Sequence, residues 1–227
     1  MALGVKTVGA ALLAVIAAGA LGAAQAMAAS PRLMVFYIEA TPAKAAGVAK
    51  ALETFASKAR EEEGPDAPVI EVLRESGRPG RMAVVEQWKD LAADKADRRT
   101  KALAAAVGGD LQAPIDDRLG DPLLPLDFTT APTGVFHVLM HIDVVPDGAD
   151  NASKALTAQK ASVMAAPGAL AFEAATQTGR PNHFAVHEVW KTRAAYEAYA
   201  ASPAGMALRQ AFTRYKGAPF DDRFYGP

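Results

Sequence analysis

The sequence predicts an α+β protein made of two ferredoxin-like βαββαβ repeats that pack sheet to sheet as a pseudo-dimeric α+β barrel. The first observation is an internal repeat, because GRPGRMAVVEQWK at residues 77–89 and GRPNHFAVHEVWK at residues 179–191 agree at eight of thirteen positions, where chance would give about one. The second is a further similarity later in each copy, between APIDDRLGDP at residues 113–122 and APFDDRFYGP at residues 218–227. The third is the order of strand and helix periodicities, which is the same in both copies.

The 227-residue chain divides into four predicted segments. The N-terminal segment has one charge, at Lys6, followed by an apolar Ala- and Gly-rich run and small-x-small steps, which is the pattern of a cleavable signal peptide. We therefore expect a periplasmic or secreted protein with no membrane segment after cleavage. The four segments are a signal peptide at residues 1–28, a first repeat at 31–122, a linker at 123–133 and a second repeat at 134–227.

The first repeat is predicted to open with a strand over residues 33–40, where apolar residues alternate and β-branched and aromatic residues are frequent. A helix follows, with Thr41 as its expected cap and Pro42 in its first turn. Residues 69–74 and 81–89 then form a hairpin around a Gly-Arg-Pro turn.

The second repeat has the same predicted order. Thr192 and Ser202 are the expected caps of its second helical region, and Pro203 follows just inside a helix start. Its strands are expected over residues 135–145, 169–176, 183–191 and around 220–225.

A four-stranded sheet with both helices on one face leaves its other face uncovered. Two copies in one chain can cover each other, which predicts an intramolecular pseudo-dimer and leaves a homo-oligomer open. In the first strand of the second repeat, the apolar residues should face the helices, and His137, His141 and Asp143 should face the space between the sheets. The helix-facing residues of this strand are Val138, Met140 and Ile142.

Composition excludes several classes of function. The 24 Lys and Arg residues are balanced by 25 Asp and Glu residues without a basic stripe, so we expect no nucleic-acid partner. The chain has no cysteine, which excludes disulfides, a thiolate nucleophile and cysteine-ligated metal sites.

The segment Glu188-Val189-Trp190-Lys191, followed by AYEAY at residues 195–199 and Ser-Pro at 202–203, resembles the antibiotic biosynthesis monooxygenase superfamily of dimeric α+β barrels. The resemblance implies a monooxygenase that oxidises a small quinol or phenolic substrate with molecular oxygen and without a cofactor. It implies catalytic roles for Trp190 and Tyr196, and it aligns a later family arginine with Arg209. The family's asparagine four residues before the tryptophan is replaced here by Val186.

By the same resemblance, Trp190 and Glu188 face the cavity, which would place His141 beside Trp190 as a catalytic base or a substrate hydrogen-bonding group. A hydrogen-bonded structural histidine is the alternative for His141. The haem-degrading branch of the superfamily needs a histidine where Ala200 stands, so no haem site is expected. The candidate substrate-binding residues are Tyr199, Glu188, Arg209, His187 and Asp143.

All four histidines lie on two strands of the second repeat that should be neighbours, at positions 137, 141, 183 and 187. Residues i and i+4 on one strand are about 13 Å apart. A metal site would therefore need one histidine from each strand and a carboxylate such as Asp143 or Glu188. Histidines that line a polar cavity are the favoured interpretation, and no metal ligand is predicted.

The two repeats differ at positions that matter for chemistry. The second has Tyr196 and Tyr199 where the first has Asp94 and Asp97, so the second repeat is the predicted catalytic half. The glutamate of each Glu-x-Trp segment is expected to pair with an arginine, either the one in the Gly-Arg-Pro turn or another across the pseudo-dimer. The alternatives to an enzyme are a non-catalytic small-molecule-binding protein and a purely structural pseudo-dimer.

Overall fold

The computed structural model describes residues 30–227. The predicted signal peptide at residues 1–28 lies outside the described residues. Among the residues that are described, no helix is both long enough and apolar enough to cross a membrane.

The first repeat has the predicted βαββαβ order. Its helix α1 is entered through a short 3-10 turn at Pro42–Lys44, and Thr41 makes no side-chain capping bond, so the predicted cap is wrong. The elements are β1 (Ser30–Glu39), α1 (Ala45–Glu63), β2 (Val69–Arg74), β3 (Arg81–Leu91), α2 (Ala93–Val107) and β4 (Asp116–Pro122).

The second repeat follows the same order, except that its second helical region is broken into two helices. Both predicted caps there are confirmed, because the side chains of Thr192 and Ser202 accept bonds of 3.2 Å from the backbone N–H groups of Ala195 and Gly205. The elements are β5 (Phe136–Asp143), α3 (Ala149–Met164), β6 (Ala169–Gln177), β7 (Arg180–Trp190), α4 (Arg193–Ala200), α5 (Pro203–Phe212) and β8 (Asp221–Tyr225).

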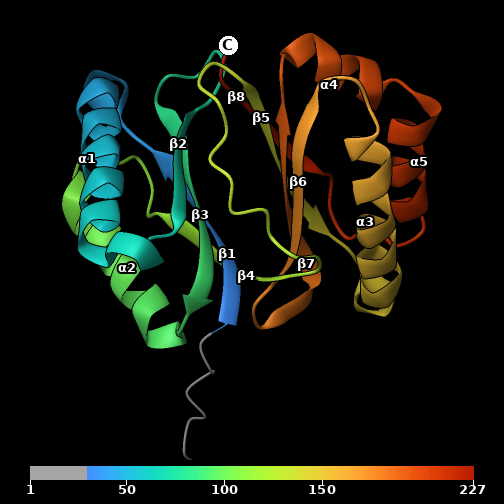
Figure 1. The fold of residues 1–227 in the computed structure, drawn as a ribbon, viewed down its shortest axis with the longest axis horizontal. Helices are drawn as coiled ribbons and strands as arrows, with labels where there is room; N and C mark the ends of the chain where they lie inside the picture. The colour runs from blue at the N-terminus through green and yellow to red at the C-terminus, as the bar shows by residue number, and fades with distance from the viewer. Residues whose placement is uncertain (1–29) are drawn as a thin grey trace, which may run out of the picture.

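The eight strands form one antiparallel sheet in the order β2-β3-β1-β4-β6-β7-β5-β8. The repeats join where β4 pairs with β6, and a side chain at Gly120 would stand 2.8 Å from Cβ of Ala175 across this junction. Just beyond β2, Glu75 forms a single antiparallel bridge with Tyr225 of β8, and Ser76 N–H donates to Phe224 O at 2.8 Å. The sheet therefore closes into the predicted barrel, and the helices cover its two outer faces (Figure 1).

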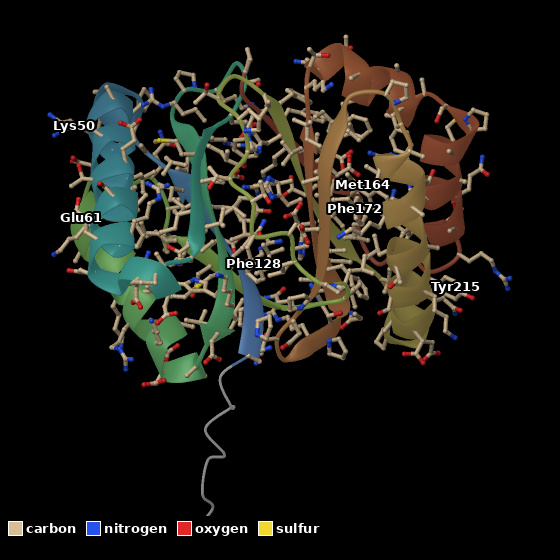
Figure 2. All side chains as sticks on the ribbon, viewed as in Figure 1. Lys50, Glu61, Phe128, Met164, Phe172 and Tyr215 are labelled. Atoms are coloured by element: carbon tan, nitrogen blue, oxygen red, sulfur yellow. The ribbon has the colours of Figure 1, made fainter. Side chains whose placement is uncertain are left out.

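Three apolar layers hold the barrel together. One lies between the first repeat's sheet and its helices, and a second occupies the same place in the second repeat. The third lies between the two halves of the sheet and includes Val35, Leu139 and Tyr225. Phe128 of the linker packs against this middle layer and lies between the two halves in Figure 2.

Candidate functional site

The pairing of β5 with β7 decides which side chains can meet. Val138 stands opposite Glu188 and Leu139 stands opposite His187, and opposite residues of an antiparallel pair point to the same face. Trp190 and Glu188 therefore point toward the helices, with the apolar residues of β5.

The four histidines point the other way, into the middle layer. The prediction that Trp190 and Glu188 share a cavity with His141 is wrong, since the sheet separates them. The predicted site residues divide accordingly into a helix-side group and a middle-layer group. The helix-side group is Trp190, Tyr196, Tyr199, Glu188 and Arg209, and the middle-layer group is His141, His187 and Asp143.

The helix-side group centres on the Glu188 carboxyl group, which is 2% exposed. Its Oε2 accepts a hydrogen bond of 2.8 Å from Trp190 Nε1. Burial raises the pKa of Glu188 to about 7, and the nearby Asp222 adds to this rise, while the Trp190 bond and Arg209 oppose it. Glu188 can therefore take up or release a proton near neutral pH.

Aromatic rings surround this carboxyl group. The ring centroid of Trp190 lies 5.2 Å from that of Tyr199 and 6.0 Å from that of Tyr196. Burial raises the pKa of Tyr196 to about 12, so its phenol stays neutral at physiological pH. The Tyr199 hydroxyl accepts from Gln159 Nε2 and donates to Ser162 Oγ at 3.3 Å.

Arg209 completes the group from α5, where it pairs with Asp222 of β8 at 2.5 Å. A cavity of about 20 Å³ is bordered by Glu188, Tyr196 and Arg209, which is room for about one water molecule. Five of the eight predicted site residues thus meet on the helix side. Sequence reasoning missed Gln159 and Asp222, although Asp222 belongs to the repeated Asp-Asp-Arg triplet that could have drawn attention to it.

The middle-layer residues form two polar clusters. In one, His141 Nε2 and His183 Nδ1 lie 2.6 and 2.7 Å from the same oxygen of Asp143. In the other, His137 and His187 approach Glu71 of β2. Sequence reasoning missed Glu71, because it lies in the first repeat and no local pattern connects it with the histidines.

The first repeat contains an equivalent of the Glu188–Trp190 pair. Trp88 Nε1 donates to Glu86 Oε2 at 2.8 Å, and the Arg99 guanidinium binds both oxygens of Glu86. Lys95 also lies 4.6 Å from the Trp88 ring centroid. Within the described residues, the expected arginine partner is therefore found in the first repeat alone, where it comes from α2 and not from the Gly-Arg-Pro turn. Among residues 30–227, Glu188 forms no salt bridge.

Two βαββαβ repeats in one closed barrel, each with a buried glutamate–tryptophan pair beneath its helices, define a pseudo-dimeric α+β barrel protein. The model of the family "Antibiotic biosynthesis monooxygenase" matches residues 31–108 and 135–211, which is more than half of the chain. The chain belongs to this family, as a tandem-repeat member.

Solved structures with the same fold match along most of the chain. A monooxygenase described as putative from Fusobacterium nucleatum has a TM-score of 0.69 at 16% identity, over 87% of this chain and 92% of that one. One from Lactobacillus acidophilus has a TM-score of 0.66 at 14% identity, over 86% and 93%. An anthrone oxidase-like protein has a TM-score of 0.60 at 16% identity, over 86% and 90%. At these identities the likeness shows the fold, and comparison with curated proteins finds no match.

Proposed function

We propose that the protein is a monooxygenase that acts on a small quinol or phenolic substrate, with molecular oxygen and without a bound cofactor, at the helix-side site of the second repeat. One observation carries the proposal: Glu188 is a buried carboxyl group whose pKa is about 7, and redox-active aromatic rings surround it. Membership of the monooxygenase family supports the reaction class.

The chemistry needs a base that removes a phenolic proton near neutral pH, and a general base works best when its pKa is close to the working pH. Glu188 meets this requirement when it is ionised. The electron-rich phenolate then supplies all four electrons that reduce oxygen. One oxygen atom enters the ring and the other leaves as water, and because the ring also gives up the two electrons and two protons that form this water, the product is a quinone. Trp190, Tyr196 and Tyr199 would hold the ring and exclude solvent, and Arg209 would bind a substrate oxygen.

A ring does not fit the cavity of about 20 Å³, so substrate entry requires the side chains or helices above it to move. The break between α4 and α5 lies over the cavity, since Ala200 and Gly205 both border it. We expect this helix pair to open outward when substrate binds. His141 and Asp143 lie on the far side of the sheet, so they take no direct part in this proposal.

A non-catalytic role in the same fold is the second candidate, and the small size of the cavity favours it. Oxygen uptake by the purified protein, measured against a panel of hydroquinones and catechols and corrected for autoxidation, separates the two. Catalysis predicts a rate that falls roughly 100-fold in Glu188→Gln, in line with loss of a general base, and falls in Trp190→Phe and Tyr196→Phe. Trp88→Phe is the matched control and should keep the rate.

No rate above background on any ring would contradict the monooxygenase proposal and support the non-catalytic role. A rate that Trp88→Phe lowers as much as Trp190→Phe does would contradict the placement in the second repeat. Export is a separate part of the proposal, supported by the apolar N-terminal run. N-terminal sequencing of protein from the periplasm or medium tests it, with cleavage expected close to residue 28.

A further inference from the structure

Three potential ligand atoms converge in the middle layer where the barrel closes. Glu71 comes from β2 of the first repeat, and His137 and His187 come from β5 and β7 of the second. Nδ1 of His137 lies 3.1 Å from Nε2 of His187, and Oε2 of Glu71 lies 3.6 and 3.7 Å from these two nitrogens. The three atoms thus form a nearly equilateral triangle with one vertex supplied by the other repeat.

The size of this triangle matches a metal coordination sphere. Zinc binds histidine nitrogen and carboxylate oxygen at about 2.0–2.2 Å, so neighbouring ligand atoms of a tetrahedral site stand about 3.4 Å apart. All three sides of the triangle lie within about 0.3 Å of that value. Two imidazoles and one carboxylate are also a donor set that divalent transition metals prefer.

The burial of the triad suits a bound cation. His137 and His187 are both buried, and each places one ring nitrogen within 3.1 Å of the other, where a single ion could bind both. The Glu71 side chain is 10% exposed, and within residues 30–227 its Oε2 has no hydrogen-bond partner. A buried carboxylate oxygen without a partner is costly, and a bound cation would remove that cost.

The site is held in place and open to solvent on one side. Glu71 Oε1 accepts a hydrogen bond of 3.0 Å from the backbone N–H of Ala131 in the linker. Hydrogen bonds of this kind orient the carboxylate ligands of metal sites. Glu71 and His137 also line a cavity of about 430 Å³ between β2, the linker and the C-terminal residues. An ion could enter through this cavity and keep a water molecule as its fourth ligand.

The second histidine cluster is a poorer candidate. The Asp143 oxygen lies only 2.6 and 2.7 Å from its two histidine nitrogens, which is shorter than the edge of a tetrahedral site. The positive charge of Arg118 also acts on His141, where it helps burial to lower the pKa. A guanidinium at this end of the middle layer opposes a second cation.

We propose that Glu71, His137 and His187 bind one divalent transition-metal ion of the zinc class, which links the two repeats at the seam between β2 and β8. The ion has three protein ligands and an open position toward the cavity. The site lies on the opposite face of the sheet from Trp190, and the proposal does not depend on the proposed oxygenase function.

The test uses protein purified without a polyhistidine tag, stripped with a chelator and titrated with Zn²⁺ by calorimetry, with mass spectrometry for stoichiometry. We expect one ion per chain, and a Tm that rises roughly 5–10 °C when free Zn²⁺ exceeds Kd a hundredfold. Co²⁺ should bind with the visible absorption of a low-symmetry nitrogen and oxygen site. These readouts require no turnover, so a failure here is distinct from a failure of the oxygenase proposal.

Glu71→Gln and His187→Gln should each weaken Zn²⁺ binding at least about 100-fold, the upper end of what loss of an outer-shell partner costs. His183→Gln is the matched control, because His183 lies on the same strand and the same face as His187, and it should bind Zn²⁺ like the wild type. If His187→Gln does not fold, Glu71→Gln alone decides. The proposal is overturned if the wild type binds no stoichiometric ion, if Glu71→Gln keeps wild-type affinity, or if His183→Gln abolishes binding.

Discussion

The two repeats contain the same glutamate–tryptophan pair, but the surroundings of the buried glutamate carboxyl group differ between them. Glu86 is bound by Arg99 and therefore sits in a buried ion pair. In the part of the chain that the structure describes, Glu188 has no such partner, and its burial raises its pKa to about 7. The same local motif is thus a fixed structural ion pair in the first repeat and a proton-binding group in the second.

The surroundings of the two tryptophans follow this difference. Trp88 is flanked by cations, with Lys95 and Arg99 near its ring. Trp190 is flanked by Tyr196 and Tyr199 instead. The two repeats thus share a scaffold and differ in the helix residues above the tryptophan, which are cationic in the first repeat and phenolic in the second.

The largest expected effect is that of removing the charge of Glu86. Glu86→Gln leaves Arg99 buried without its carboxylate, and breaking such a pair costs about 3–5 kcal/mol. Glu188→Gln keeps an oxygen that can accept from Trp190, so its free energy of unfolding at pH 7 should stay within about 1 kcal/mol of the wild type. Urea unfolding of the two variants measures the contrast.

A second substitution sharpens this result. Arg99→Met added to Glu86→Gln removes the unpaired charge and should recover part of the lost stability, since a buried pair can often be replaced by apolar residues. Equal losses in Glu86→Gln and Glu188→Gln would show that the two repeats do not differ as described.

The next effect is the pH dependence that Glu188 gives to stability. Its folded pKa of about 7 lies above the ordinary value of 4.5, so the folded state holds the proton more tightly than the unfolded state. The stabilisation is fully present below about pH 4.5 and is lost as pH rises through about 7, with a total of about 3 kcal/mol.

Urea unfolding at pH 5 and pH 8 tests this dependence. Other groups also titrate, so the quantity to compare is the difference between the wild type and Glu188→Gln at each pH. The wild type should lose stability relative to the variant as pH rises. Parallel pH profiles for the two proteins would mean that Glu188 has an ordinary pKa.

Local patterns were enough to predict the fold. The repeated Gly-Arg-Pro turn and the order of periodicities depend only on residues that are close in sequence. The hairpins that they predict are observed as the β2–β3 and β6–β7 pairs. The caps at Thr192 and Ser202 were predictable for the same reason. The cap predicted at Thr41 was wrong because the chain passes through a 3-10 turn before α1 begins.

The site was only partly predictable, because its parts depend on contacts between distant segments. The motif around Trp190 and Tyr196 identified the helix-side group. Its face was assigned by resemblance, whereas the pairing of Trp190 with Phe136 places it with the apolar residues of β5. Arg99 reaches Glu86 from a helix, and Glu71 reaches His137 across the closing seam, so neither contact has a sequence pattern of its own.

The smallest expected effect concerns the helix caps of the two repeats. Thr192 caps α4 with its side chain, but Ala92 at the start of α2 has the extended backbone of an N-cap without a capping side chain. Thr192→Ala should cost about 1 kcal/mol, and Ala92→Ser should stabilise by about 0.5 kcal/mol, because a serine oxygen at an N-cap can accept from an N–H group of the first turn. Thermal unfolding measures both, and Ala92→Val serves as a control that adds side-chain atoms without a capping oxygen. A gain in Ala92→Val equal to that in Ala92→Ser would attribute the effect to packing and not to capping.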